Sequence, residues 1–119
     1  MYELDLRDGE RAVSFARQVI ESHLDGESVP APDLEETGLS QQRGAFVTLD
    51  VDGSLRGCIG RPYPEQRAFE AIRNGAIGAA TEDPRFPPVS PAEMDEITVE
   101  VSVLSQPEPV VVDGDRPSL

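Results

Sequence analysis

Arg56 and Cys58 are the residues whose types and spacing could do chemistry, and both belong to the segment LRGCIG (55–60). A thiol becomes a nucleophile when a cationic neighbour or a helix N-terminus lowers its pKa. An Arg close to a core-facing position is unusual unless it pairs with a carboxylate or binds an anion. The segment therefore predicts either a site for an anionic or polar group, or a structural use of both side chains.

Cys58 has three interpretations: a small buried side chain, a residue that lines a site, or a nucleophile. The usual general base is missing nearby, because the only histidine is His23 and no local spacing connects it with Cys58. A single cysteine excludes an internal disulfide and zinc sites built from several cysteines. Cys58 is therefore a candidate catalytic residue without an assigned reaction, and neither a metal nor a cofactor is predicted.

Arg56 has two interpretations, a structural pair with an acid such as Asp83 or a contact with an anion or substrate. Gly57 and Gly60 join it as candidate binding residues, because glycine within a strand indicates a bulge or a close backbone approach. Asp83 by itself is expected to cap a turn.

The distribution of charged residues along the sequence adds Arg61 to the candidate binding residues, and Arg85 is the last of these candidates. Residues 54–81 contain four Arg against two Glu, so this stretch carries +2 and the rest of the chain −15. In so acidic a chain, a segment with few acidic residues is expected to be covered by its own fold or by a partner, or to face an anionic or polar ligand. Phe86, next to Arg85, is expected to cover the core.

A β-hairpin over residues 44–60 must position these candidates. Asp-Gly at 52–53 lies between two β-rich runs and predicts a two-residue turn, because such a turn needs positive φ. The register that follows from this turn has these pairs: Val51 with Ser54, Leu49 with Arg56, and Val47 with Cys58.

With that register Arg56 and Cys58 share one face of the sheet, because successive side chains of a strand alternate between faces. Phe46, Leu55 and Ile59 are expected on the other face. The hypothesis of a common site for the guanidinium and the thiol depends on this arrangement.

Apolar residues at helical spacing predict helices over 9–24 and 65–81, and residues 25–42 between the first helix and the hairpin predict a surface loop. Alternating apolar residues predict a strand over 97–104, which a right-handed crossover makes parallel to the second hairpin strand. Residues 105–119 form a Pro-rich acidic tail. The expected fold is α+β, with a mixed sheet of hairpin and crossover strand packed against the two helices.

Two local signals refine this fold. Ser90-Pro91-Ala92-Glu93 predicts a short helical turn, with a capping box and Pro at its first position. The second helix contains glycines at 75 and 78, which cost helix propensity and are expected to permit close packing on the sheet.

The chain of 119 residues fits one domain and is very acidic, with 23 Asp and Glu, 10 basic residues that are all Arg, and a net charge of −13. Such a charge costs stability by self-repulsion unless salt screens it. We expect a halophilic, salt-adapted cytoplasm; the alternative is an acidic interaction protein that meets a basic partner. Generic nucleic-acid binding is disfavoured, because phosphate contacts need clustered positive charge.

No apolar run approaches the roughly 18 residues that cross a bilayer. Residues 1–11 are charged and lack the apolar stretch of a secretory signal. The sequence therefore predicts a soluble cytoplasmic protein without a membrane partner.

Four segments together resemble the AMMECR domain family, which is widespread in archaea. They are GAFVTL (44–49), GSLRGCIG (53–60), AATEDPRFPPV (79–89) and DEITVEVSVL (95–104). LRGCIG with DPRFPPV is the most specific combination, and the resemblance extends from the first helix over nearly the whole chain.

The resemblance implies an α+β fold with a larger and a smaller lobe and a cleft suggested as an active or binding site. It transfers no catalytic role to Cys58 or Arg56, because no biochemical activity is established for the family. It also implies association with a Memo-like protein and a radical-SAM protein, which often accompany prokaryotic members. Family members usually continue past Leu119, so residues 1–119 correspond to the N-terminal portion. Apolar sheet surface left exposed in that portion would favour oligomers.

Two functional classes follow. The first is a non-catalytic adaptor or regulatory module that holds a protein partner on the acid-poor surface. The second is an enzyme component, in which Arg56 holds an anionic or polar group and Cys58 lines the site. The classes differ in thiol behaviour, because an enzymatic Cys58 is accessible and unusually reactive near neutral pH, whereas a core Cys58 reacts only on unfolding.

Overall fold

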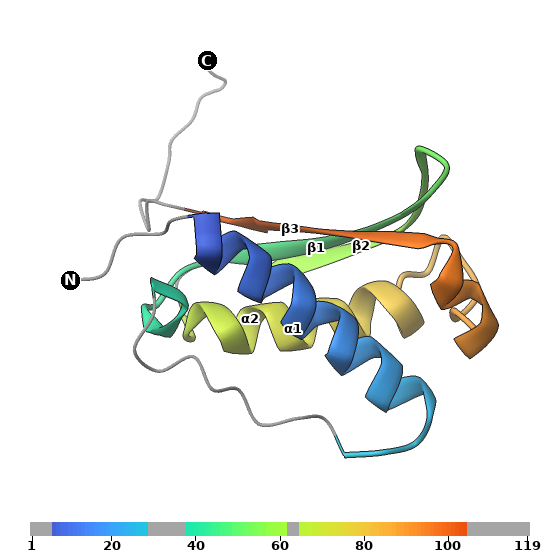
Figure 1. Cartoon of the computed structure of the whole chain (residues 1–119), viewed down its shortest axis with the longest axis horizontal. Coiled ribbons are helices and arrows are strands. Elements are labelled where there is room, and N and C mark those ends of the chain that lie inside the picture. Colours follow the sequence, from blue (N-terminus) through green and yellow to red (C-terminus); the bar gives the residue numbers. More distant parts are fainter. Residues whose placement is uncertain (1–5, 29–37, 62–64, 105–119) are drawn as a thin grey trace.

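The structure, a computed structural model, describes residues 6–28, 38–61 and 65–104, without the side chains of residues 6–8 and 38. Its elements, in chain order, are helix α1 (Leu6–Leu24), the 3-10 turn η1 (Gly38–Ser40), strands β1 (Ala45–Val51) and β2 (Ser54–Arg61), helix α2 (Ala68–Thr81), the 3-10 turn η2 (Pro91–Asp95) and strand β3 (Ile97–Val103). Figure 1 shows two layers, with both helices on one side of the sheet and no coloured element on the other. The α+β class expected from the sequence is confirmed.

The three strands lie in the order β2-β1-β3, and both pairings are antiparallel. Strand β3 runs in the same direction as β2, as the crossover predicts, but it pairs with β1 and not with β2. The prediction of a mixed sheet is therefore wrong. Its physical reason is that the crossover rule sets handedness and direction but not the edge of the hairpin that the third strand joins.

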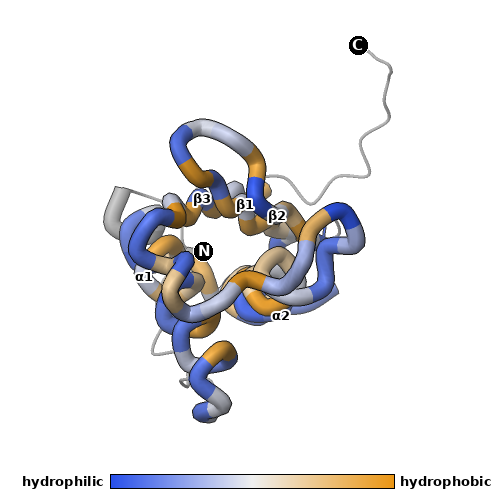
Figure 2. The backbone as a smooth tube through the Cα atoms, turned by 90° about the vertical axis from the view of Figure 1, so that its right-hand side faces the viewer, coloured by the Kyte–Doolittle hydropathy of each residue, from blue (hydrophilic) through white to orange (hydrophobic). Residues whose placement is uncertain are grey.

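Helix α1 begins at Leu6, three residues before the predicted start, and packs against α2 and β3. Viewed at right angles to Figure 1, the two helices lie beneath the sheet (Figure 2). The apolar stripe of α1 is buried as its spacing predicts. The buried residues of α1 are Ala12, Phe15, Ala16, Val19 and Ile20.

Helix α2 begins at Ala68 and not at 65, because Arg67 is extended and its N–H donates to Glu70 Oε1 over 3.0 Å. The predicted close packing of its glycines is confirmed. A Cβ at Gly75 would lie 3.0 Å from the carbonyl oxygen of Ile59, and one at Gly78 would lie 2.9 Å from Cγ2 of that residue. Glycine here lets the helix approach strand β2 closely.

The predicted loop over 25–42 is described only at its two ends. It contains the short turn η1, in which Leu39 is fully buried and joins the core. This anchor was not predicted, because a single Leu in a polar stretch has no periodicity. Residues 29–37 and the predicted tail 105–119 lie outside the described residues.

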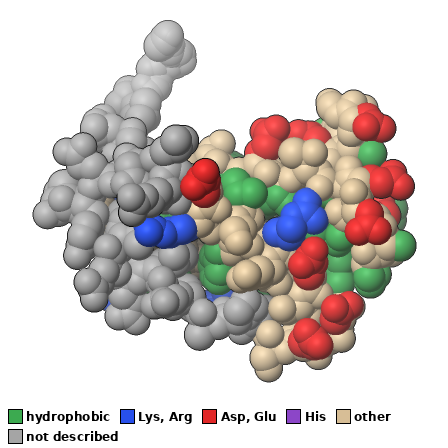
Figure 3. Space-filling view, in the orientation of Figure 1, with side chains coloured by type: hydrophobic (Ala, Val, Ile, Leu, Met, Phe, Trp, Pro, Cys, Tyr) green, Lys and Arg blue, Asp and Glu red, His purple; other side chains and the backbone are tan. Residues whose placement is uncertain are grey.

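Among the described residues, no helix is both long enough and apolar enough to cross a membrane. Acidic side chains are scattered over the face shown in Figure 3, with few basic ones among them. This surface agrees with the acidic composition of the chain.

Candidate functional site

The hairpin turn forms where Asp-Gly predicts it, and a β-bulge follows directly. Asp52 and Gly53 have φ of 51° and 82°, and Val51 pairs with Ser54 as expected. The register then shifts, because Asp50 pairs with Leu55 whereas Leu49 pairs with Gly57. Arg56 is the extra residue of this bulge. The predicted pairs of Leu49 with Arg56 and of Val47 with Cys58 are therefore wrong.

The bulge separates the two residues that the sequence hypothesis joined. Cys58 pairs with Thr48, and its Sγ lies 3.3 Å from Thr48 Oγ1, on the face away from the helices. Arg56 instead reaches the segment between α2 and β3, on the helix side of the sheet (Figure 1). Arg56 and Cys58 thus lie on opposite faces, and the expectation of a common face is wrong. Phe46 and Leu55 were expected on the face opposite Cys58 but share its face, whereas Ile59 lies on the helix side as expected.

The guanidinium of Arg56 forms an ion pair with Glu93 of η2. Nε donates to Oε2 over 3.0 Å and Nη2 donates to Oε1 over 3.1 Å, and the Arg56 side chain is 14% exposed. Arg56 lowers the pKa of Glu93, and the backbone N–H of Ser90 adds to the effect. The structural interpretation of Arg56 is thereby supported, with Glu93 as the acid in place of the suggested Asp83. Nη1 of Arg56 is buried without a partner among the described atoms.

Asp83 has a different role, at the outer edge of β2. Its Oδ2 accepts the backbone N–H of Cys58 over 3.0 Å, and its two oxygens accept three further hydrogen bonds from the backbone and side chain of Arg85. The Arg85 guanidinium, followed by its backbone N–H, holds the pKa of this buried carboxyl well below its usual range, although burial opposes the shift. The predicted turn cap is present, since Asp83 Oδ1 accepts the backbone N–H of Arg85 and the backbone carbonyl of Asp83 accepts the N–H of Phe86.

Phe86 lies between two cations. Its ring centroid is 6.0 Å from the guanidinium carbon of Arg56 and 5.5 Å from that of Arg85. These distances are within cation–π range. The segments LRGCIG and DPRFPPV therefore contact each other, and we call the joined residues the clasp: Arg56, Asp83, Arg85, Phe86 and Glu93.

The two glycine candidates serve close packing. A Cβ at Gly57 would overlap the carbonyl oxygen of Ala79 on α2, and one at Gly60 would overlap the ring of Phe46. The predicted bulge and close approach are thus found at these positions. Arg61 is exposed at the end of β2, outside the clasp.

The sheet face away from the helices, which we call the open face, holds Cys58. The register of the three strands places these residues on it: Phe46, Thr48, Asp50, Leu55, Cys58, Gly60, Thr98, Glu100 and Ser102. Cys58 is half-buried and Leu55 is 41% exposed. Among the strand residues that the structure describes on this face, two are carboxylates and none is basic.

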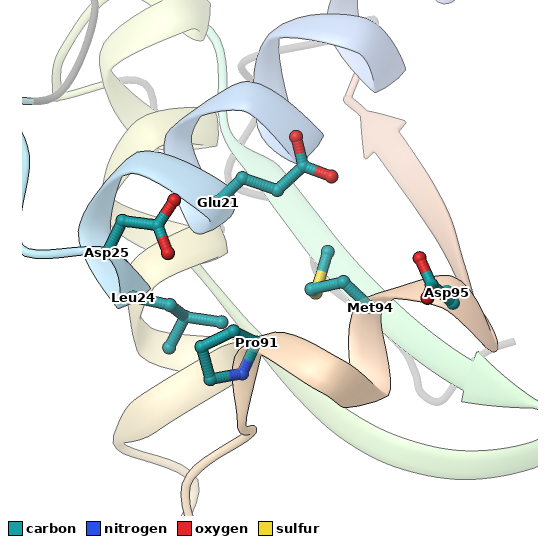
Figure 4. Close-up of a pocket in the computed structure, with 6 residues that line it drawn as sticks. All are labelled: Glu21, Leu24, Asp25, Pro91, Met94 and Asp95. Carbon is teal, nitrogen blue, oxygen red and sulfur yellow. The ribbon is translucent and has the colours of Figure 1, made fainter.

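A separate cavity of about 230 Å³ lies between the end of α1 and η2 (Figure 4). None of the sequence candidates lines it. Its lining residues are Glu21, Leu24, Asp25, Pro91, Met94 and Asp95. Within the described ranges, no cluster of three or more His, Cys, Asp or Glu side chains could hold a metal ion.

These features define an α+β domain with a three-stranded antiparallel sheet, covered on one face by two helices and locked by the clasp. The AMMECR1 family profile matches residues 13–116, and the chain belongs to the AMMECR1 family. This confirms the resemblance noted in the sequence.

Two archaeal proteins are similar to most of the chain. A protein of Methanothermobacter thermautotrophicus is 50% identical over 115 residues, which are 94% of this chain and 60% of that protein. A protein of Methanosarcina barkeri is 50% identical over 107 residues, which are 87% of this chain and 53% of that protein. The chain thus spans a little over half the length of these curated relatives.

A solved structure agrees with the fold. The crystal structure of the uncharacterized protein PH0010 from Pyrococcus horikoshii superposes with a TM-score of 0.74 at 44% sequence identity. The match covers 80% of this chain and 50% of that chain.

Proposed function

We propose that this AMMECR1-family chain is a non-catalytic adaptor module that holds a protein partner on the open face of its sheet. The observation that carries the proposal is the separation of Arg56 from Cys58 by the bulge. The guanidinium is engaged in the clasp with Glu93, so it does not lie beside the thiol. A nucleophile needs a cation or a base beside it that is free to act on it. Arg85 interacts electrostatically with Cys58, but its guanidinium is held by Asp83.

The acid-poor stretch 54–81 is a weaker docking surface than the sequence suggested. Nine of its residues are buried in α2 alone, so its low acid content follows largely from coverage by the chain's own fold. The open face, by contrast, has no described element on it (Figure 1). We therefore propose the open face, without Arg61, as the partner surface.

Photo-crosslinking from two exposed positions tests the proposal. A benzophenone amino acid replaces Thr98 on the open face or, as the matched control, Ser14 on α1; both positions are exposed. We expect a discrete, identifiable crosslinked protein from position 98, absent from position 14 and retained in Cys58→Ser. Equal crosslinking from both positions, or none from position 98, would contradict the adaptor proposal.

The enzyme alternative keeps one supporting observation, the half-buried and thus partly accessible thiol of Cys58. Association with Memo-like and radical-SAM proteins remains a proposal based on the family resemblance. The crosslinked species identifies or rejects such a partner directly. We also propose a salt-rich cytoplasm as the setting of the protein, on the basis of its net charge of −13.

A further inference from the structure

The open face has two halves of different chemistry. Its apolar half lies along β2, where Leu55 and Cys58 are exposed or half-exposed and the ring of Phe46 lies over Gly60. Its polar half lies along β1 and β3 and carries the carboxylates of Asp50 and Glu100. The cross-strand register places Asp50 opposite Leu55 and Glu100 opposite Thr48, so the two halves adjoin.

The two carboxylates lack a counter-charge. Neither Asp50 nor Glu100 forms an ion pair or a hydrogen bond through its side chain within the described ranges, although Asp50 is half-buried. Arg56 of the hairpin does not supply this charge, since it is paired with Glu93 on the helix side of the sheet. Carboxylates without a neighbouring cation favour an incoming positive charge, and more strongly where they are partly buried, as Asp50 is.

We propose that the open face binds a basic amphipathic segment of a partner protein. The apolar side chains of that segment contact Phe46, Cys58 and Leu55. Its Lys or Arg side chains form ion pairs with Asp50 and Glu100. This inference rests on the proposed adaptor function and names the chemistry of its partner. Charge complementarity selects the segment, and the apolar half supplies the buried contact. An acidic segment of equal apolarity is rejected, because it would place like charges against Asp50 and Glu100.

The thiol of Cys58 reports occupancy of this face, since it is the only cysteine of the chain. Native protein at moderate KCl concentration is alkylated with and without a short amphipathic helical peptide of Leu and Lys, and the modified fraction is followed by mass spectrometry. A Leu–Glu peptide of the same pattern is the matched probe. We expect the Leu–Lys peptide to slow alkylation to a plateau and the Leu–Glu peptide to leave the rate unchanged.

Charge-removing variants locate the effect. Asp50→Asn and Glu100→Gln should each weaken protection by the Leu–Lys peptide about two- to fivefold, the range expected for partly exposed ion pairs. Glu10→Gln on the exposed surface of α1 is the control and should change nothing. Two independent variants keep the test valid if one of them fails to fold.

Four results would overturn the proposal. Two concern the peptides: both protect Cys58 from alkylation equally, or neither protects it. The other two concern the protein without peptide: Cys58 is already unreactive because the chain's own residues cover it, or its protection grows with protein concentration because a second copy covers it. Crosslinking from position 98 separates failure of the adaptor proposal from failure of the proposed basic segment. A discrete crosslinked partner together with failure of the peptide test rejects the basic segment but leaves the adaptor function standing.

Discussion

The carboxylate of Asp83 accepts the backbone N–H of Cys58 over 3.0 Å at the outer edge of β2. An unpaired edge strand can pair with another chain, and proteins block such edges in several ways. Here a buried acid, itself held by Arg85, occupies one donor of that edge. Residues of the DPRFPPV motif thus cover part of the edge of β2, the strand that contains LRGCIG.

Replacing this acid should loosen the edge. We expect Asp83→Ala to lower the urea midpoint of unfolding, because the N–H of Cys58 and the donors of Arg85 lose their shared acceptor. The variant should also self-associate more than the parent, as measured by light scattering. Glu82→Ala, at the exposed neighbouring position, is the control, and an equal effect there would contradict this role.

The clasp predicts a dependence of stability on acid pH. The pKa values of Asp83 and Glu93 are lower in the folded chain than their ordinary values, so the folded state binds fewer protons than the unfolded state. Their contribution is present above the ordinary carboxyl pKa of about 4 and is lost as pH falls below it. Urea unfolding from pH 6 to pH 2 should show this loss, and Asp83→Asn should show a smaller one.

The pair of Arg56 and Glu93 should contribute a modest coupling energy. A double-mutant cycle with Arg56→Met and Glu93→Gln should give about 1 kcal/mol, since Glu93 is partly exposed and solvent screens the pair. A coupling energy near zero would show that the two side chains act independently. The same Arg56→Met variant should leave the alkylation rate of Cys58 unchanged, because the guanidinium lies on the opposite face.

Two glycine substitutions should have opposite signs. Gly57→Ala would drive a Cβ into the carbonyl oxygen of Ala79, so we expect a loss of about 1–3 kcal/mol or more in the free energy of unfolding. Gly9→Ala lies on α1 with open space around it and should gain about 0.5–1 kcal/mol from helix propensity. Thermal unfolding of both variants measures the difference, and equal signs would contradict the close packing of β2 on α2.

The net charge of −13 predicts a stability that rises with salt. Self-repulsion is largely screened at about 1 M salt, where the Debye length is near 3 Å. We expect the melting temperature to increase from dilute buffer to molar KCl. A melting temperature that stays flat or falls would remove the argument for salt adaptation.

The sequence by itself determined the local structure. The helical stripe of α1, the Asp-Gly turn, the alternation of Ile97–Val103 and the capping box of Ser90 and Glu93 depend on residues close together in the chain, so their patterns could be recognised without coordinates. The same holds for the family, because LRGCIG and DPRFPPV are contiguous strings.

Only the tertiary structure decided which residues contact the side chains and backbone of these two motifs. Arg56 pairs with Glu93 across 37 positions and Cys58 with Asp83 across 25, and no local spacing distinguishes these partners from the many other acids. Gly57 indicated a bulge or a close approach, but the effect of the bulge on the register depends on the distant helix, because only a residue without a Cβ fits beneath Ala79. Long-range packing therefore turned Arg56 away from Cys58 and left the thiol on the open face.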